Sequence, residues 1–207
     1  GIIGTGHHYY WIGTPGYWLW WGGIFSALEP LPILFMVFDT LNHVRHKKLE
    51  VTNRVALYWA VGCAVFHFIG AGVWGMIHTL PSVNRWTHGT QVTASHGHMA
   101  FFGAYAMMIL TVIYYALPKL KGMKEFNQKR GFWAFWITVS AMMSIGLAFG
   151  AAGVVQAYMQ RGLGTDFLTV QGFMRPWFMA VFFSGLAFFV GVIIYIYDVL
   201  ALATKKA

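Results

Sequence analysis

Long apolar segments alternate along the chain with short stretches that carry most of its charged residues. A helix that crosses a bilayer needs about 20 predominantly apolar residues, because the hydrocarbon core is ~30 Å thick and each residue rises ~1.5 Å. Residues 1–13 resemble the end of one such helix, closed by a turn at Pro15 and Gly16. Full spans are expected at residues 17–42, 54–80, 88–117, 131–160 and 175–203. The pattern therefore predicts an all-α, polytopic transmembrane helical bundle with five full spans plus a partial first helix.

The composition supports a membrane location. Of the 207 residues, 58% are hydrophobic and 10% are charged, which is too little polar material to cover a water-soluble globule of this size. We expect residues 1–207 to form a single transmembrane domain in contact with the lipid bilayer. The chain opens on Gly1 without an initiator Met, a basic region or a cleavage site, so we do not read a signal peptide and expect a portion of a longer or processed chain. Cys63, the only cysteine, lies in an apolar run and is expected to serve packing.

Positive charge is distributed unevenly over the breaks between the segments. The net charge of +8 does not indicate nucleic-acid binding, because the basic residues form short clusters between apolar runs. Eleven of them fall on one side of the predicted bundle: Arg45, Lys47, Lys48, Arg54, Lys119, Lys121, Lys124, Lys129, Arg130, Lys205 and Lys206. The alternate breaks hold Arg85, Arg161 and Arg175. By the positive-inside rule, the basic loops are cytoplasmic and residues 14–16, 81–87 and 161–174 face outward, towards the periplasm of a bacterium. A multi-pass protein of the bacterial inner membrane is expected.

Tryptophans cluster near the predicted ends of the spans, as in an interfacial aromatic belt. We assign Trp59, Trp133 and Trp136 to the cytoplasmic belt. The outward belt would comprise Trp11, Trp18, Trp20, Trp21, Trp86 and Trp177.

Two histidine pairs are the main candidates for chemistry. His7 and His8 lie in the partial helix, roughly 10–12 Å below the outward surface at ~1.5 Å per residue. Adjacent α-helical residues point ~100° apart, so both imidazoles can reach one metal ion between them. His96 and His98 flank Gly97 at a similar predicted depth, but residues at i and i+2 point ~200° apart and would serve two different metals. Hydrogen-bonded bundle histidines without a metal are the alternative for each pair.

The equal depth of the two pairs favours metal binding. Axial imidazole commonly holds haem iron, and Gly97 leaves room for a flat macrocycle. One face of the helix carrying His96 would then hold a haem that looks towards the ion at His7 and His8, and the other face would hold a second haem. This arrangement predicts an electron-transfer chain that ends at a binuclear centre.

Several motifs strengthen this interpretation through a family resemblance. The string GTGHHYYWIGTP at residues 4–15 and FSALEP at residues 25–30 resemble the catalytic subunit of bacterial nitric oxide reductases, in the haem-copper oxidase superfamily. HTL at 78–80, HGTQ at 88–91 and HGHMAF at 96–101 stand in the same order as in that family. By this resemblance, the chain corresponds to the C-terminal half of such a subunit.

The resemblance implies a role for each histidine of the two pairs. His7 and His8 would bind non-haem iron, His96 would be the proximal ligand of a high-spin haem b, and His98 an axial ligand of a low-spin haem b. The remaining ligands, and most of a calcium site, would come from the N-terminal half of the subunit. The implied reaction converts two nitric oxide molecules to nitrous oxide and water. A membrane-anchored cytochrome c subunit, or a quinol, would supply the electrons.

Outside the two pairs, a carboxylate and a group of surface residues are further candidates. Glu29 is placed deep in a span, where a carboxylate is a functional candidate by default. The resemblance places it near the non-haem iron as a catalytic residue that stays ionised or relays protons, with structural hydrogen bonding as the alternative. His88 is a candidate contact for a haem propionate, with interfacial snorkelling as the alternative. Thr79 is a candidate for lining the distal pocket. Asp39 and Asp198 are expected at the cytoplasmic interface.

Three other functions compete with nitric oxide reduction. An oxygen-reducing haem-copper terminal oxidase would use the same histidines with copper in place of iron, although Glu29 favours iron. A two-haem electron conduit would leave His7 and His8 unused, and a transport or structural bundle would bind no metal. The match of GAGVWG at residues 70–75 to a dinucleotide-binding fingerprint is rejected, because it lies inside a predicted span without a strand and fits helix packing better.

Overall fold

The computed structural model describes residues 2–47 and 52–204, and within them every regular element is a helix. Five helical rods are long and apolar enough to cross a membrane: Tyr17–His46, Arg54–Thr79, Gln91–Leu120, Gln128–Gly162 and Phe167–Leu202. These rods confirm the all-α class and the five predicted spans. Lys48, Lys205 and Lys206, which belong to the predicted basic side, lie outside the described residues.

Most rods consist of more than one helical element. In chain order the elements are the 3₁₀-helix η1 (Ile2–Tyr9), α1 (Tyr17–Ala27), α2 (Pro30–His46), α3 (Arg54–His67), the π-helix η2 (Phe68–Trp74), α4 (Gly75–Thr79), α5 (Pro81–Thr87), α6 (Gln91–Phe101), the π-helix η3 (Phe102–Ala106), α7 (Met107–Leu120), α8 (Gln128–Ala157), the π-helix η4 (Tyr158–Gly162) and α9 (Phe167–Ala203). Three of the five rods therefore contain a π-helical stretch, a feature that often accompanies functional sites.

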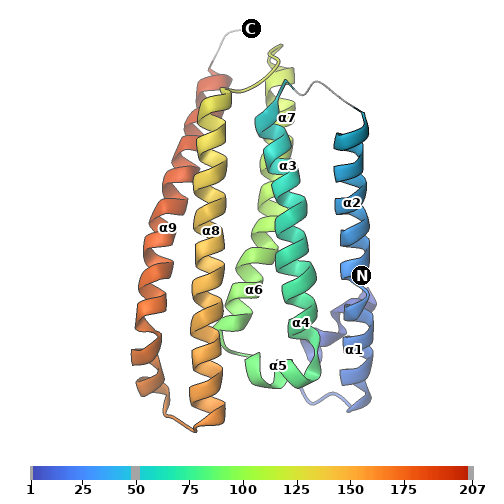
Figure 1. The fold of residues 1–207 in the computed structure, drawn as a ribbon, viewed down its shortest axis with the longest axis vertical. Coiled ribbons are helices and arrows are strands. Elements are labelled where there is room, and N and C mark those ends of the chain that lie inside the picture. The colour runs from blue at the N-terminus through green and yellow to red at the C-terminus, as the bar shows by residue number, and fades with distance from the viewer. Residues whose placement is uncertain (1, 48–51, 205–207) are drawn as a thin grey trace.

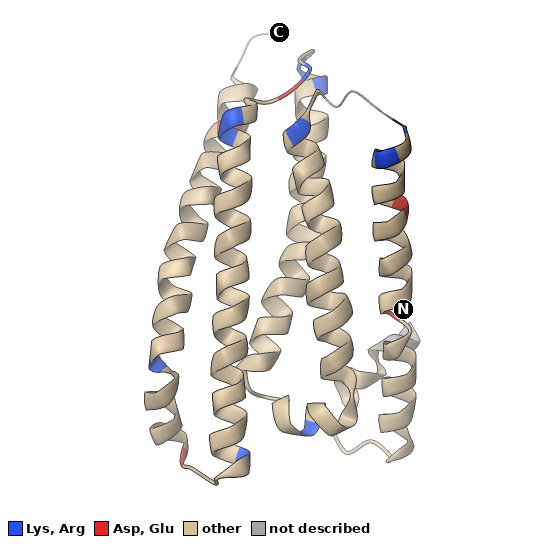
Figure 2. Ribbon diagram, viewed as in Figure 1, with Lys and Arg blue, Asp and Glu red and all other residues tan. Residues whose placement is uncertain are grey.

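The rods run roughly parallel to one another and define two ends of the bundle (Figure 1). One end holds α5 and the turn at residues 163–166, and we call it the α5 end. The other end holds the end of α2, the start of α3 and the connection at residues 121–127, and we call it the basic end. Lys and Arg gather at the basic end, with fewer at the α5 end (Figure 2), as the charge pattern predicts.

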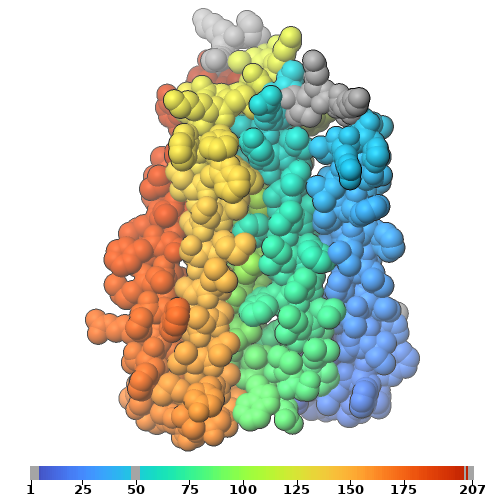
Figure 3. Space-filling view, in the orientation of Figure 1, coloured from blue at the N-terminus to red at the C-terminus, as the bar shows by residue number. Residues whose placement is uncertain are grey.

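The largest buried side chains lie between α3, α7 and α8. Trp59 and Tyr114 are fully buried, with ring centroids 6.1 Å apart, and Phe135 meets the Trp59 ring edge-on at 5.0 Å. The assignment of Trp59 to an interfacial belt is therefore wrong, whereas Trp133 and Trp136 are exposed as expected. The outer rods, α2 and α9, border the bundle on either side (Figure 3) and bury few of their apolar side chains.

Close packing of α6 on α8 depends on glycines. A Cβ atom at Gly146 would lie 2.5 Å from Sδ of Met99, and one at Gly153 would collide with the backbone nitrogen of Val92. Two helices approach this closely only where side chains are absent. Gly146 and Gly153 thus form a small-residue packing face of α8 towards α6.

Several predicted helix boundaries differ from the structure. Residues 2–9 form a 3₁₀-helix rather than an α-helix. The fifth rod begins at Phe167 instead of residue 175, so Arg175 lies inside α9. Asp166 explains this early start, because its Oδ1 accepts a hydrogen bond from the Thr169 backbone N–H at 3.0 Å and caps the helix. Hydrogen bonds from Thr169 also hold the pKa of the exposed Asp166 carboxyl below its ordinary value.

Candidate functional site

His7 and His8 lie on η1, which packs against α1. Their ring centroids are 4.1 Å apart with an interplanar angle of 36°. Nδ1 of the half-buried His7 lies 2.6 Å from the hydroxyl oxygen of buried Ser26, whereas His8 is exposed. A Cβ at Gly22 on α1 would approach the His7 backbone nitrogen to 2.8 Å, so the absence of a side chain there allows η1 to lie this close. The 3₁₀ geometry turns ~120° per residue rather than ~100°, yet the two rings remain neighbours.

His96 on α6 contacts the π-helical part of the second rod. Its Nδ1 lies 2.9 Å from the carbonyl oxygen of Gly70 in η2, and a Cβ at Gly75 would lie 3.1 Å from its ring. A Cβ at Gly70 would lie 2.6 Å from the backbone carbon of Met99, so the η2 and α6 backbones touch. Glycines of the rejected dinucleotide fingerprint thus serve helix packing. The Gly70 contact fixes the imidazole with Nδ1 as the donor and leaves Nε2 for another partner.

His98 has a different set of neighbours. Its Nδ1 lies 2.7 Å from the Ala94 carbonyl oxygen, its ring lies 4.9 Å from that of Phe149 on α8, and its side chain is exposed. A Cβ at Gly97 would have no neighbour within 4 Å. The two imidazoles of the His96–Gly97–His98 motif thus contact different helices beside an open surface. The helix begins at Gln91 rather than near His88, so both histidines lie fewer residues inside it than predicted.

The pairs that are distant in sequence come together at the α5 end. His8 interacts electrostatically with both Glu29 and His96. The rings of His78 and His96 have centroids 5.9 Å apart. Within the described residues, however, no group of three or more His, Cys, Asp or Glu side chains is arranged to hold one metal ion. Further ligands are needed to complete any metal centre here.

Glu29 lies at a break in the first rod instead of in a continuous helix. The helix α1 ends at Ala27, and Glu29 caps α2, whose first residue is Pro30. Proline has no N–H to donate to the preceding turn, which explains the break. The side chain is half-buried and makes no capping hydrogen bond. The break therefore leaves the carboxylate available to a partner near His8.

His78 anchors a polar network that the sequence did not predict. The side chain is buried, its Nδ1 lies 3.0 Å from the Thr87 hydroxyl, and its Nε2 lies 3.2 Å from the Thr93 hydroxyl. Its backbone carbonyl accepts a hydrogen bond from Nδ2 of Asn84 at 2.7 Å. The threonines are separated from His78 by 9 and 15 residues, so only the fold of α5 over the end of α4 brings them together.

Thr79 and His88, two further candidate residues from the sequence, differ in exposure: one is buried and the other lies on the surface. Thr79 is buried, and its carbonyl accepts a hydrogen bond from the Tyr10 hydroxyl at 2.9 Å. His88 is exposed in the turn after α5. Its carbonyl and that of Arg85 each accept a hydrogen bond of 2.5 Å from the Arg161 guanidinium. Arg161 thus clamps this turn to the end of the fourth rod.

Comparison with known proteins identifies the family. The family model described as "Cytochrome C and Quinol oxidase polypeptide I" matches residues 1–197. A nitric oxide reductase subunit of Stutzerimonas stutzeri is 47% identical over 206 residues, which cover 96% of this chain and 44% of that protein. A cytochrome c oxidase subunit 1 homologue of Agrobacterium tumefaciens (strain T37) is 27% identical over 86% of this chain and 32% of its own length.

A solved structure shares the fold. A cryo-EM structure of a heme-copper terminal oxidase dimer superposes with a TM-score of 0.79 at 17% sequence identity, over 99% of this chain and 40% of that one. The chain thus spans less than half the length of the relatives it matches. With five spans of this kind, it is a multi-pass membrane protein. The chain belongs to the cytochrome c and quinol oxidase polypeptide I family of the haem-copper oxidase superfamily, and it is similar to a nitric oxide reductase subunit.

Proposed function

We propose that the chain is part of a respiratory nitric oxide reductase catalytic subunit, which reduces two molecules of nitric oxide to nitrous oxide and water. The main structural support is the convergence of the His7–His8 pair and His96 at the α5 end, where His8 interacts electrostatically with His96 and Glu29. The 47% identity to the nitric oxide reductase subunit of Stutzerimonas stutzeri supports the same reaction.

The histidines fit the cofactors of such a centre. With Nδ1 hydrogen-bonded to a backbone carbonyl, His96 and His98 each present Nε2 as a ligand, the usual arrangement of a metal-bound imidazole. In this proposal His96 is the proximal ligand of a high-spin haem b and His98 an axial ligand of a low-spin haem b. The space beside Gly97 suits a macrocycle, since a Cβ there would meet nothing within 4 Å.

His7 and His8 would contribute two ligands to a non-haem iron. Ser26 orients His7 through its 2.6 Å contact with Nδ1. Because the described residues hold no complete ligand set, the remaining ligands would come from the N-terminal half of the same subunit. The calcium of the centre would likewise be bound mainly through that half.

When bound, the two haems and the iron would carry two electrons from the external donor and would supply the redox chemistry by which two nitric oxide molecules and two protons become nitrous oxide and water. The protein holds their ligands at fixed positions, which favours the encounter of two small substrates. Glu29, half-buried and near His8, would stay ionised beside the iron or relay protons to the reacting oxygen. His88, exposed above the site, would contact a haem propionate.

The surroundings of the subunit follow from the same proposal. Residues 1–207 would form one transmembrane domain, the C-terminal portion of a larger subunit in a bacterial inner membrane. The basic end would face the cytoplasm, supported by the gathering of Lys and Arg there. Electrons would enter near the α5 end from a membrane-anchored cytochrome c subunit or from quinol.

Substitution of the haem ligands in the complete enzyme tests this function. His96→Ala should remove the high-spin haem and abolish nitric oxide consumption at an electrode, and His98→Ala should remove the low-spin haem. Haem is quantified by the pyridine haemochrome assay, and His46→Ala, in the last turn of α2, is the matched control. Unchanged haem content in both ligand variants would refute the assignment.

Metal analysis of the intact enzyme separates this function from that of an oxygen-reducing terminal oxidase. The proposal requires one non-haem iron and no copper for every two haems. Copper in that ratio, together with rapid oxygen reduction, would identify an oxidase instead.

A further inference from the structure

The short helix α5 is hydrogen-bonded to the segment that carries His7 and His8. Nε1 of Trp11, which follows η1, donates a hydrogen bond to Oδ1 of Asn84 on α5 at 2.5 Å. Asn84 is 3% exposed, and its Nδ2 donates to the carbonyl of His78, in the last turn of α4, at 2.7 Å. The Asn84 amide therefore uses its acceptor towards the segment of one histidine pair and its donor towards α4.

The His78 imidazole continues this connection to α6. Its Nε2 lies 3.2 Å from the Thr93 hydroxyl on α6, and its Nδ1 lies 3.0 Å from the Thr87 hydroxyl at the end of α5. Thr93 precedes His96 by three residues, and positions three apart are neighbours on a helix surface. His78 thus extends the hydrogen-bonded path from α5 to the turn of α6 that carries His96.

A second hydrogen bond runs parallel to this path. The Tyr10 hydroxyl donates to the Thr79 carbonyl at 2.9 Å, and both residues are buried. Tyr10 and its neighbour Trp11 therefore both bind the segment formed by α4 and α5. A buried hydrogen-bonding group that loses its partner destabilises the structure, so these bonds oppose any change in the spacing of the two histidine pairs.

We propose that Asn84 is a positioning residue that fixes the separation between the His7–His8 pair and His96. The inference rests on the proposed function, in which these histidines bind the non-haem iron and the iron of the high-spin haem. Asn84 acts through its two hydrogen-bond partners. A primary amide is suited to this position because it carries both an acceptor for the indole N–H and a donor for the backbone carbonyl.

The separation matters because two nitric oxide molecules meet between the two irons in the proposed reaction. A displacement of ~1 Å caused by a remote substitution can lower a reaction rate about 100-fold. Magnetic coupling between two irons also weakens as their separation grows. The electron paramagnetic resonance (EPR) signal of the high-spin haem therefore reports the spacing independently of activity.

Asn84→Asp and Trp11→Phe, made in the complete enzyme, each break one link of the path. The first replaces the donor of the amide by an acceptor, and the second removes the indole N–H but keeps an aromatic ring. At haem and iron contents equal to those of the unmodified enzyme, we expect a larger high-spin haem EPR signal and a rate of nitric oxide consumption lower by up to about 100-fold. The double variant should add little to either single variant, because both substitutions interrupt the same path.

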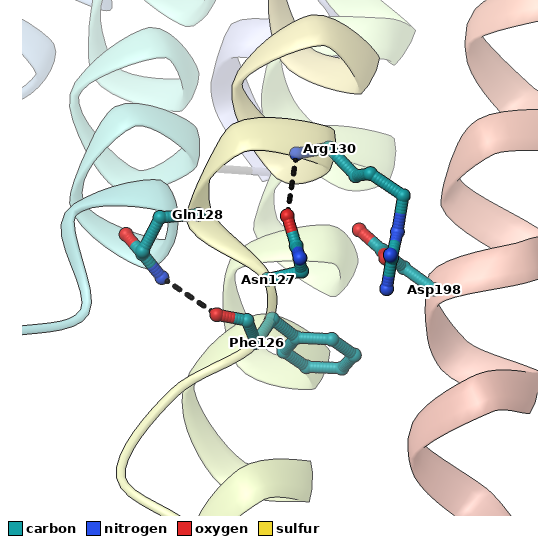
Figure 4. Close-up of polar contacts among 5 residues, drawn as sticks. All are labelled: Phe126, Asn127, Gln128, Arg130 and Asp198. Carbon is teal, nitrogen blue, oxygen red and sulfur yellow. Dashed lines mark hydrogen bonds and ion pairs between the residues drawn. The ribbon is translucent and has the colours of Figure 1, made fainter.

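A buried ion pair at the basic end supplies the matched control. Nε of Arg130 on α8 donates a 2.6 Å hydrogen bond to Oδ1 of Asp198 on α9, and Figure 4 shows the Arg130 side chain reaching across to it. Although expected at the cytoplasmic interface, the Asp198 side chain is 0% exposed and lies inside the bundle. Arg130→Gln leaves this carboxylate without its cation and should lower the melting temperature. It should leave the EPR spectrum unchanged, because the pair lies at the opposite end of the bundle from α5.

The outcomes separate positioning from general stability and from the proposed function. An EPR spectrum and a rate unchanged in both Asn84→Asp and Trp11→Phe would overturn the proposal. The same spectral change in Arg130→Gln, or loss of haem or iron from the Asn84 variant, would assign the effect to stability or cofactor binding and would also overturn it. If Asn84→Asp fails to fold, Trp11→Phe still decides. An unmodified enzyme without non-haem iron would refute the proposed function itself, whereas an intact centre with unchanged variants refutes this inference alone.

Discussion

The contact between α6 and α8 makes a sharp prediction for Gly153→Ala. A Cβ at this position would collide with the Val92 backbone nitrogen and would also lie 2.7 Å from the backbone carbon of Gln91. Neither backbone atom can rotate away, as a flexible side chain would. The helix α6 must therefore shift, and His96 lies one helical turn beyond Val92 on that helix.

Two opposing effects determine how much Gly153→Ala changes the free energy of unfolding. Overpacking a close-packed interface destabilises the fold by about 1–3 kcal/mol, whereas the higher helix propensity of alanine stabilises it by up to ~1 kcal/mol. We expect a net loss of roughly 1–2 kcal/mol, which corresponds to a melting temperature lower by about 2–8 °C. The displaced His96 should also lower haem occupancy or alter the haem absorption spectrum.

Gly185→Ala supplies the matched comparison, because it is the same substitution in a helix and its Cβ would meet nothing within 4 Å. Melting is followed by tryptophan fluorescence of the detergent-solubilised enzyme, and haem by absorption. If Gly153→Ala melts at the same temperature as Gly185→Ala with an unchanged haem spectrum, the argument from backbone contact is wrong.

Three other substitutions test separate features. Ser26→Ala removes the hydroxyl that contacts the His7 Nδ1 and should weaken iron binding about 10–100-fold. Iron occupancy is measured at limiting iron, and an occupancy equal to that of the unmodified enzyme would contradict the prediction. His78→Leu removes two hydrogen bonds of ~1 kcal/mol each and should lower stability by about 1–2 kcal/mol in a thermal melt; no change would mean that the threonine contacts contribute nothing. Asp166→Ala should lower the melting temperature at neutral pH. Because the pKa of the Asp166 carboxyl is lowered in the folded state, the carboxylate stabilises the fold at pH values above its ordinary pKa of about 4, and this stabilisation is lost as the pH falls through the lowered pKa. The difference in melting temperature from the unmodified enzyme should therefore disappear in acid. A difference that persists in acid would assign the effect to something other than the Thr169 cap.

The spans could be predicted because hydropathy and length depend only on local sequence. Boundaries were less accurate, since they depend on specific contacts such as the Asp166 cap and on Pro30, which breaks the first rod beside Glu29. Trp59 was misplaced because position near a span's end does not reveal which way a side chain faces. Burial of that ring depends on Tyr114 and Phe135, which come from other helices.

Only part of the candidate site's geometry could be predicted from the sequence, and the metal roles of its histidines stay predictions. Spacing indicated that His96 and His98 would contact different neighbours, and they do. The hydroxyl partners of His78 and the buried position of Asp198 were not predictable, because each contact joins elements that are distant in sequence. Their contacts arise only from the packed fold.

The clamp made by Arg161 has an evolutionary consequence. Arg161 binds the backbone carbonyls at positions 85 and 88, which every amino acid provides, rather than the side chains of Arg85 and His88. Mutation at those two positions can therefore remodel the outer surface of the turn without releasing it. Replacement of Arg161 removes both tethers at once. The Arg161 side chain, on a neighbouring rod, thus allows the exposed residues of this turn to vary in evolution while the backbone of the turn keeps its position above the histidines.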